Sequence, residues 1–358
     1  MAVLTGLLRR AMSRFGRVEI STPHAVRGPR DHVIIIDGTM SSLQDGYETN
    51  AGITYKLLCE ASADSAVAVR YEAGIQWQTW RSTIDVIEGR GINRQIRRVY
   101  GYLASRYRAG DRIFLFGYSR GAYAVRSLAG MIDRVGLLTA KYATERNIRL
   151  AYRYYERAAT SNAARIFRAS RCHREAPIEM VGVWDTVKAL GFQAPLVWRW
   201  TERAHAFHNH ALGASIRHGY HALALDENRV AYEPVMWDCS QDWPGHVEQI
   251  WFRGSHGDVG GQLSGFHAAR PLANIPLTWM LEKAEMCGLT LPDDWQSRYP
   301  TDPTAPAAGT LRGWSKFFWR RKKRRVGRGP SEALHPTAER PTDDGGVLGW
   351  MRRARPVQ

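Results

Sequence analysis

Apolar residues occur along the chain in short uninterrupted runs, most of which end at a polar residue or glycine. The clearest runs are at 32–39, 66–71, 113–116, 178–184 and 247–252. Continuous apolar runs of this length are typical of strands that are buried on both faces, as in parallel sheets. We therefore predict five main strands, of which 247–252 is the last, and a weaker strand at 231–237.

Between these runs the apolar positions recur with a helical period. The pattern predicts helices at 53–61, 92–107, 120–132 and 275–287, and a basic helical region at 137–176. Segments 73–94 and 187–225 read as long loops, the second with helix, and the sequence leaves open whether either forms a lid. Alternating strands and helices predict an α/β fold with a mostly parallel central sheet, helices on both faces and long inserted loops.

Charge is distributed unevenly in this chain of 358 residues. The formal net charge is +16, and residues 312–328 hold nine Lys or Arg and no acidic residue. Together with Trp314, Phe317, Phe318 and Trp319, the basic run at 316–328 fits contact with an anionic membrane surface. Non-specific binding of nucleic acid is a weaker interpretation, and a solvated, partly disordered extension is the plainest one.

The sequence also supports predictions about the cellular location and the domain boundaries of the protein. Its four cysteines are scattered, and no run of about 18 apolar residues indicates a transmembrane helix. Because the charges near the N-terminus follow the apolar residues, a secretory signal is not expected. We predict a cytoplasmic or peripheral membrane protein with three parts: a basic extension or helix at 1–30, a catalytic domain at 31–299, and a linker with a basic, partly disordered tail at 300–358.

One stretch combines a strand, a glycine-flanked serine and a helix. The strand at 113–116 leads into Gly117-Tyr-Ser119-Arg-Gly121, and a helical pattern follows directly. This G-x-S-x-G arrangement is the nucleophile elbow, in which a sharp turn projects a serine hydroxyl away from the sheet. Gly117 and Gly121 avoid steric clashes at such a turn. Ser119 is therefore a candidate nucleophile, although a structural Gly-Ser turn would share this pattern.

A nucleophilic serine requires a base and a carboxylate that orients it. Asp185 follows the strand at 178–184, and His256 follows the strand at 247–252 in a glycine-rich loop that also holds Asp258. Both lie in the order Ser, Asp, His that α/β-hydrolases use. Three histidines that do not directly follow a predicted strand are rival bases: His221, His267 and His335.

Asp37, Gly38 and Thr39 end the first strand at the same edge of the sheet. The amides of Gly38 and Thr39, with that of Arg120, are candidates for an oxyanion hole. Asp37 as the nucleophile of an aspartyl phosphatase is discounted, because that chemistry needs a carboxylate where Ile35 stands. No metal or other cofactor is expected, although the dense group His205, His208 and His210 invites adventitious cation binding.

Five motifs occur here in one order: Asp37-Gly-Thr, Gly117-Tyr-Ser-Arg-Gly-Ala122, Val183-Trp-Asp-Thr-Val187, the run 221–229, and Trp251-Phe-Arg-Gly-Ser-His-Gly-Asp-Val-Gly-Gly261. Together they resemble the catalytic domain of the type VI secretion lipase effectors of the phospholipase group, over roughly 31–290. The resemblance implies an α/β-hydrolase that cleaves phospholipid acyl esters without a metal, with Ser119, Asp185 and His256 as nucleophile, acid and base.

The chain departs from that family at two places near the expected site. Met40-Ser41 replaces a tryptophan-containing segment, and Gln262-Leu263 replaces a glycine and an aromatic residue. A separate membrane-targeting module is not evident either, so delivery by a secretion apparatus stays an open alternative. The sequence thus predicts a serine esterase or phospholipase. The alternative is a catalytically silent hydrolase fold that contacts membrane or nucleic acid through its basic tail.

Overall fold

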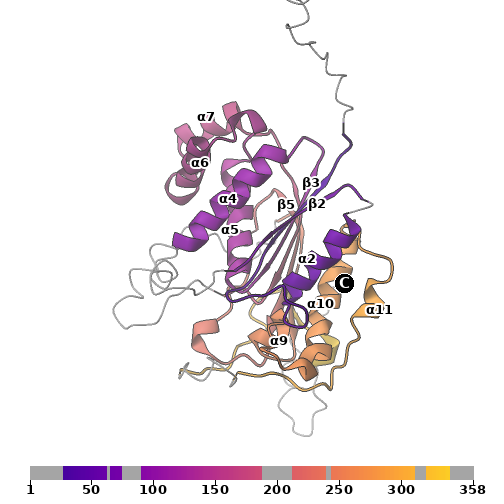
Figure 1. Cartoon of the computed structure of the whole chain (residues 1–358). Helices are drawn as coiled ribbons and strands as arrows, with labels where there is room; N and C mark the ends of the chain where they lie inside the picture. The colour runs from indigo at the N-terminus through magenta and orange to yellow at the C-terminus, as the bar shows by residue number, and fades with distance from the viewer. Residues whose placement is uncertain are drawn as a thin grey trace, which may run out of the picture.

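The computed structural model describes residues 27–62, 65–74, 90–187, 212–238, 243–310 and 320–338. A central sheet runs through this part of the molecule, with helices on both of its faces (Figure 1). The sheet contains seven strands in the order β2-β1-β3-β4-β5-β6-β7, and every neighbouring pair is parallel. This arrangement confirms the predicted α/β-hydrolase class with helices on both faces.

Five of the seven strands coincide with the apolar runs of the sequence, and β5 and β7 do not. The seven strands are β1 (Asp31–Ile36), β2 (Val67–Glu72), β3 (Arg112–Tyr118), β4 (Ile178–Trp184), β5 (Ile216–Ala224), β6 (His246–Phe252) and β7 (Glu332–Leu334). In the central strands β3 and β4 nearly every residue is buried, because helices cover both faces of the sheet.

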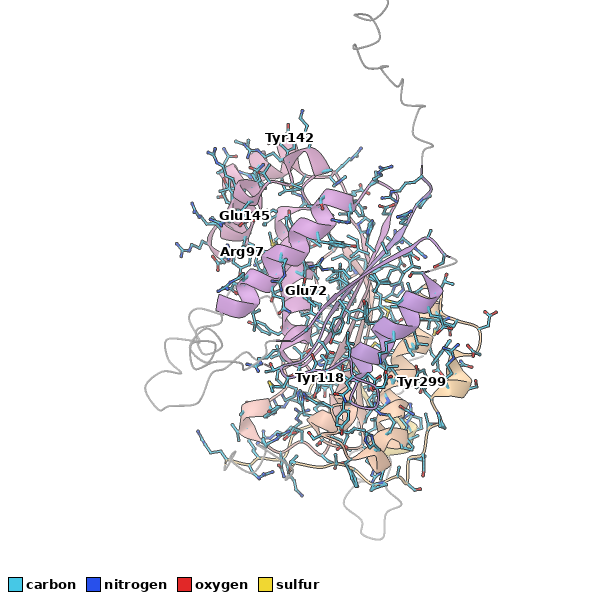
Figure 2. The ribbon with its side chains drawn as sticks, in the orientation of Figure 1. Glu72, Arg97, Tyr118, Tyr142, Glu145 and Tyr299 are labelled. Atoms are coloured by element: carbon cyan, nitrogen blue, oxygen red, sulfur yellow. The ribbon has the colours of Figure 1, made fainter. Side chains whose placement is uncertain are left out.

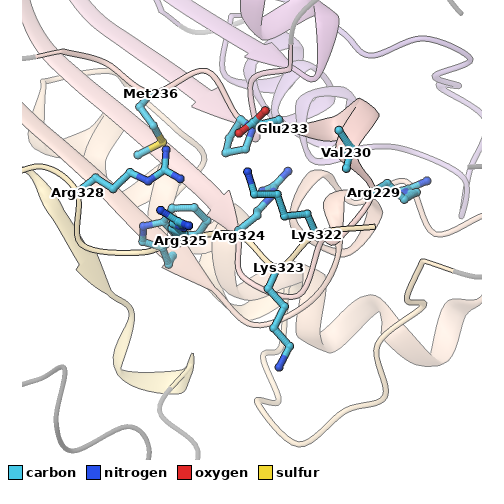
Figure 3. Close-up of a pocket in the computed structure, with 11 residues that line it drawn as sticks. Arg229, Val230, Glu233, Met236, Lys322, Lys323, Arg324, Arg325 and Arg328 are labelled. Atoms are coloured by element: carbon cyan, nitrogen blue, oxygen red, sulfur yellow. The ribbon is translucent and has the colours of Figure 1, made fainter. Parts of the chain in front are cut away.

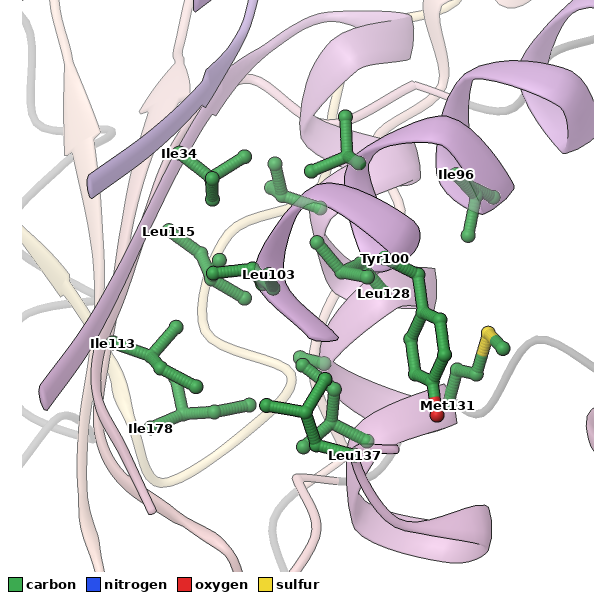
Figure 4. Close-up of a cluster of buried hydrophobic side chains, with 14 of the residues drawn as sticks. Ile34, Ile96, Tyr100, Leu103, Ile113, Leu115, Leu128, Met131, Leu137 and Ile178 are labelled. Atoms are coloured by element: carbon green, nitrogen blue, oxygen red, sulfur yellow. The ribbon is translucent and has the colours of Figure 1, made fainter. Parts of the chain in front are cut away.

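Two hydrophobic clusters, one on each face, hold the layers together. In β1, Ile34 and Ile36 join one cluster while Val33 and Ile35 join the other, as the two-residue period of a strand requires. Helices α4 (Arg90–Arg106) and α5 (Arg120–Val135) contribute to the first cluster (Figure 4). Helix α6 (Glu145–Arg157) contributes to it as well. Helices α2 (Asn50–Ala61) and α10 (Arg270–Met286) contribute to the second.

Several shorter helices complete the described structure. They are α7 (Asn162–Arg171), α9 (His256–Gly260), α11 (Trp295–Arg298) and the 3-10 turns η1 (Ala140–Tyr142), η2 (Val230–Tyr232), η3 (His267–Ala269) and η5 (Pro336–Ala338). Helix α4 illustrates why these segments fold as they do. Its buried residues Ile92, Ile96, Val99 and Leu103 recur at three- to four-residue intervals and form one apolar face.

Three predictions about strands are wrong. Segment 231–237 is not a strand: it contains part of η2 and an isolated bridge from Pro234 to Val187. Strand β5 lies inside 187–225, for which the sequence predicts loop and helix because Arg217, His218 and His221 interrupt the apolar pattern. Strand β6 is not the last, since β7 pairs with it in parallel through residues 332–334.

The C-terminal basic region is partly built into the same structure. Strand β7 extends the sheet beyond the predicted catalytic boundary at residue 299, and η5 follows it. The backbones of Arg229 and Arg321 form an isolated antiparallel β-bridge, which joins the chain after β5 to the basic run. The described portion at 320–338 is therefore packed against the domain, which the composition of this segment did not reveal. The proposed N-terminal helix lies almost wholly outside the described residues.

Within the described residues, no helix is long and apolar enough to cross a membrane.

Candidate active site

The candidate residues meet at the carboxyl edge of the sheet. Ser119 follows β3, Asp185 follows β4, and His256 begins α9 just after β6. Parallel strands bring these three chain positions to the same edge. Figure 2 shows Tyr118, the neighbour of Ser119, at the end of the sheet that lies away from Tyr142 and Glu145.

Ser119 sits in a strained turn between β3 and α5. Its φ of 58° and ψ of −120° are rare for a residue with a side chain. The neighbouring glycines permit the close packing that holds this turn. A Cβ on Gly121 would lie 2.1 Å from the Ile36 carbonyl oxygen, and a Cβ on Gly117 would lie 2.7 Å from the Ala122 backbone. The predicted elbow geometry is therefore present.

The three predicted side chains form a continuous hydrogen-bonded chain. His256 Nε2 lies 2.8 Å from Ser119 Oγ, and His256 Nδ1 lies 2.6 Å from Asp185 Oδ2. Because the carboxylate accepts a hydrogen bond from Nδ1–H, Nε2 carries no proton and can accept the serine proton. All three residues are buried: Ser119 is 7% exposed, His256 is 4% exposed and Asp185 is fully covered.

Asp185 is held on several sides. Its φ of 39° lies in the left-handed region, so its backbone is also strained. Oδ1 accepts the Ala224 amide at 3.0 Å, and Arg324 donates to both carboxylate oxygens, at 2.5 Å and 2.9 Å. The next amide, that of Thr186, donates to His221 Nε2 at 3.1 Å. Contacts from β5 and from the basic run thus fix this carboxylate.

Electrostatics at the site favour an ionised Asp185 and a neutral His256. Burial raises the pKa of Asp185, but the charge of Arg324 and the bond to His256 outweigh it, so its pKa lies well below the usual range. Burial also disfavours the charged form of His256 and lowers its pKa, which the bond to Asp185 only partly offsets. A neutral imidazole beside a serine hydroxyl is the form needed for a general base.

A second ion pair supports the backbone of His256. Glu227 and Arg229 pair at 2.5 Å with both side chains buried, and Glu227 accepts the His256 amide at 3.2 Å. Tyr118 stacks on the imidazole at 4.9 Å between ring centroids, and Tyr232 meets it edge-on at 4.7 Å. The sequence assigned none of these four residues a role, although Glu227 and Arg229 lie within one of the resemblance motifs.

The predicted oxyanion amides are not equivalent. The Gly38 amide donates to its neighbour Asp37 Oδ1 at 2.6 Å, which leaves the Thr39 and Arg120 amides as the better candidates. Asp37 also accepts bonds from Thr49 and Tyr71, both at 2.7 Å. Burial raises the pKa of Asp37, although these hydrogen bonds favour its ionised form and act in the opposite direction. Asp37 therefore organises the loop after β1, and the structure gives it no contact with Ser119.

Asp258 has a supporting position rather than a contact with the His256 ring. Its carboxylate accepts the Ser255 amide at 2.8 Å and the Ser255 hydroxyl at 2.7 Å, which caps α9. It also accepts the Ala308 amide at 2.6 Å, so it ties segment 308–309 to the start of α9. These contacts hold the start of the helix that begins with His256.

The rival histidines have other partners. His221 is buried in β5, where burial lowers its pKa to about 3, and it accepts the Thr186 amide. His267 packs against Tyr47, while His335 stacks on Phe252 and bonds to Thr337. His205, His208 and His210 lie outside the described residues. In the described part of the chain, no cluster of three or more His, Cys, Asp or Glu residues has a geometry suited to a metal ion.

Arg120 is a half-buried cation directly after the serine. Burial lowers its pKa, and among the described residues none forms a hydrogen bond or an ion pair with its side chain. It also begins α5, where the positive end of the helix dipole disfavours a cation. Burial and the helix dipole therefore both act against the charge of Arg120.

A basic recess lies beside the Asp185 network (Figure 3). Its volume is about 580 Å³ including the open mouth, and six of its lining residues are cationic while one, Glu233, is acidic. Arg229 and Arg324 face carboxylates of the site. The other four have no acidic partner among the described residues: Lys322, Lys323, Arg325 and Arg328. Sequence composition predicted the charge of this region but not its proximity to the site.

The chain is similar to proteins of known sequence and of known structure. In Saccharomyces cerevisiae, the uncharacterized protein YEL023C is 27% identical over 230 residues, which cover 57% of this chain and 32% of that protein. The chain therefore spans about a third of the length of this curated relative.

Three solved structures match the chain at lower sequence identity. The Tle1 effector bound to the VgrG spike of the Type 6 secretion system is 16% identical, with a TM-score of 0.35 over 66% of this chain and 52% of that chain. An uncharacterized protein from Pseudomonas aeruginosa is 13% identical, with a TM-score of 0.43 over 76% and 49%. An esterase from Thermogutta terrifontis is 13% identical, with a TM-score of 0.34 over 74% and 86%.

The family comparison is more extensive. Residues 30–283 match the family described as "T6SS, Phospholipase effector Tle1-like, catalytic domain". This match covers well over half of the chain and includes Ser119, Asp185 and His256. The chain therefore belongs to the family of Tle1-like phospholipase effector catalytic domains.

Proposed function

We propose that this protein is a serine hydrolase that cleaves acyl esters of glycerophospholipids. The observation that carries the proposal is the continuous contact from Ser119 through His256 to Asp185, with distances of 2.8 Å and 2.6 Å. Ser119 Oγ attacks the ester carbonyl while His256 Nε2 takes the hydroxyl proton. Asp185 accepts the Nδ1–H bond and stabilises the imidazolium that forms.

The remaining steps use the same groups. The amides of Thr39 and Arg120, at the start of α5, stabilise the negative charge on the carbonyl oxygen. The tetrahedral intermediate collapses, and His256 returns its proton to the leaving alcohol, which departs as a lysophospholipid. Water then attacks the acyl–Ser119 ester with His256 again as base, and the fatty acid leaves as Ser119 recovers its proton.

Two observations favour a phospholipid over a neutral ester. The family is that of phospholipase effector catalytic domains. The cation of Arg120 next to the nucleophile has no counter-ion among the described residues and would attract the phosphate of a bound lipid.

The test compares Ser119→Ala with the parent on p-nitrophenyl butyrate and on phosphatidylglycerol or phosphatidylcholine vesicles. Loss of nearly all hydrolysis, and of labelling by a fluorophosphonate probe, is expected. Ser170→Ala serves as the matched control, because Ser170 is an exposed serine on α7 whose hydroxyl bonds within its own helix. Equal rates for Ser119→Ala and the parent would overturn the assignment of the nucleophile.

The alternative is a catalytically silent fold that binds a surface. No labelling of Ser119 at high probe concentration, with the protein folded, would favour this alternative. The structure offers support for surface binding in either case, because the basic recess presents four exposed cations without acidic partners among the described residues.

We therefore also propose peripheral contact with an anionic membrane through the basic recess. The test measures sedimentation with vesicles of phosphatidylcholine alone or with added phosphatidylglycerol. A Lys322→Gln, Lys323→Gln, Arg328→Gln variant is expected to lose binding to anionic vesicles. Its matched control replaces Arg146, Arg153 and Arg157 on α6 with Gln, which removes the same charge elsewhere. Equal losses of vesicle binding in both variants would show that net charge alone, and not the basic recess, determines binding. Competition by RNA would indicate a nucleic-acid ligand instead.

A further inference from the structure

The basic run contains one arginine whose environment differs from that of its neighbours. Lys322, Lys323 and Arg325 are exposed, whereas the side chain of Arg324 is only 4% exposed. The guanidinium reaches the carboxylate of Asp185, 139 residues earlier in the sequence. The run therefore inserts a single charge into the catalytic site while the adjacent cations stay at the surface.

The contact is bidentate and well enclosed. Arg324 Nη1 lies 2.5 Å from Asp185 Oδ1, and Nη2 lies 2.9 Å from Oδ2. Nη1 also donates to the Ala224 carbonyl at 2.8 Å, and Nη2 donates to the Tyr232 carbonyl. A planar guanidinium that bonds two carboxylate oxygens and two carbonyls fixes the carboxylate plane, which a single point charge cannot do.

Position separates this pair from an ordinary structural ion pair. Oδ2 of Asp185 accepts both His256 Nδ1, at 2.6 Å, and Arg324 Nη2. Any rotation of the carboxylate that lengthens one of these contacts changes the other. The cation also neutralises part of the carboxylate charge that stabilises an imidazolium, so Arg324 acts on both the geometry and the basicity of His256.

We propose that Arg324 is a positioning residue of the catalytic site, and that its bidentate pair holds Asp185 in the orientation that accepts the His256 Nδ1–H. This inference rests on the proposed hydrolase function. Arg324 does not contact Ser119, so it works through Asp185 and His256 only. The basic run is then a component of the site as well as a surface for anions.

The other groups that face His256 bear on the expected pH dependence. Glu227 and Arg229 approach from the connection after β5, Tyr118 from β3, and Tyr232 from η2. Glu227 favours the imidazolium, whereas Arg229 disfavours it. Removal of the Arg324 charge leaves these four groups in place, so it should shift the titration of His256 toward higher pH.

The test uses the full chain with Arg324→Met, Arg324→Lys and the control Arg321→Met. Arg321 is the appropriate control because it anchors the same segment, through Asn228 at 2.6 Å and Thr310 at 2.7 Å, without contact to Asp185. For Arg324→Met we expect a fall of at least about tenfold in kcat/KM on p-nitrophenyl butyrate, and an acidic limb that moves to higher pH. Arg324→Lys should keep the limb near the parent position and recover part of the rate.

Folding and function are separated by two further measurements. Thermal unfolding identifies variants that fail to fold, and the His256 imidazole titration is followed by NMR after assignment with His256→Gln. A folded Arg324→Met protein with an unchanged His256 titration and rate would overturn the proposal, as would an equal pH shift in Arg321→Met. If the parent hydrolyses no ester and Ser119 is unlabelled, but the titration still responds to Arg324, the hydrolase function fails while the positioning role stands.

Discussion

Two buried ion pairs flank His256, and they are built differently. Glu227 and Arg229 lie two residues apart and pair at 2.5 Å, whereas Asp185 and Arg324 lie 139 residues apart and also pair at 2.5 Å. Glu227 accepts the backbone amide of His256, while Asp185 accepts its imidazole. Similar chemistry therefore serves two purposes: one pair holds the chain at His256, and the other holds the ring.

The two ion pairs should contribute similarly to stability but differently to the proposed catalysis. Both carboxylates are buried, and each is kept ionised by a paired guanidinium. Removal of either carboxylate charge therefore leaves a buried arginine without its partner. Both changes should therefore destabilise the fold to a similar extent. In the proposed mechanism, only the change at Asp185 alters the group that orients the general base.

The largest expected effect follows replacement of Asp185 by Asn. The amide keeps the shape of the carboxylate but cannot stabilise the imidazolium, and it favours the wrong tautomer of His256. We expect kcat to fall by about 10⁴-fold, as is typical for this change in serine triads. The measurement is steady-state hydrolysis of p-nitrophenyl butyrate by protein shown to be folded by circular dichroism. A loss below tenfold would place the carboxylate outside the catalytic group.

Replacement of Glu227 by Gln should separate stability from catalysis. Arg229 would then be a buried charge without its carboxylate, and such losses cost about 3–5 kcal/mol of unfolding free energy. The glutamine oxygen can still accept the His256 amide, so the folded protein should lose much less activity than the Asp185 variant. Urea unfolding and fluorophosphonate labelling rates, measured on the same samples, check this. If the two variants lose activity equally, the contrast between ring and backbone support is wrong.

The sequence predicted the catalytic candidates because each lies next to a strong local signal. Ser119 follows a strand and precedes a helix between two glycines, and Asp185 and His256 each follow a buried strand. Parallel topology then brings strand ends together, so an ordered set of strand-ending residues is informative. Glu227 and Arg229 lay within a recognised motif, although only the structure showed that they support His256.

Arg324 could not be found in this way. Its neighbours are all basic, so composition predicts a solvated or membrane-facing run and does not distinguish one arginine from the next. Its role depends on β7, a three-residue strand with no strong apolar pattern, which returns the chain to the sheet. The sequence does not predict strand β5 for a related reason. His221 counts as a polar position in the pattern, although it is buried in the strand and accepts a hydrogen bond from the Thr186 amide.

His221 provides a smaller test of the support beneath Asp185. Burial lowers its pKa to about 3, against about 6.5 in an unfolded chain. Between these values the unfolded state binds a proton that the folded state does not, so stability falls as the pH decreases from 6.5 toward 3. The contribution is at most about 1.4 kcal/mol per pH unit. In His221→Gln this contribution is absent, so its stability deficit relative to the parent should narrow at low pH.

Urea unfolding of the parent and His221→Gln at pH 7, 5.5 and 4 measures this change. A deficit that stays constant across the three pH values would mean that His221 takes up a proton in the folded protein. The comparison uses only the difference between the two proteins, so titration of the other buried groups cancels if they are distant from His221.

The smallest expected effect is the pH at which the base itself is lost. Burial lowers the pKa of His256, and the bonds and charge of Asp185 and the charge of Glu227 only partly offset it. Since a general base must be neutral, the acidic limb of kcat/KM should have its midpoint below 6.5, and activity should persist as the pH falls through that value.

The two ion pairs then make opposite predictions. Glu227→Gln removes a negative charge near His256 and should move the limb to lower pH, whereas Arg324→Met removes a positive charge and should move it to higher pH. Full pH profiles with a neutral ester substrate measure both. Shifts of the same sign would show that a general loosening of the site, and not the charge of each pair, controls the basicity of His256.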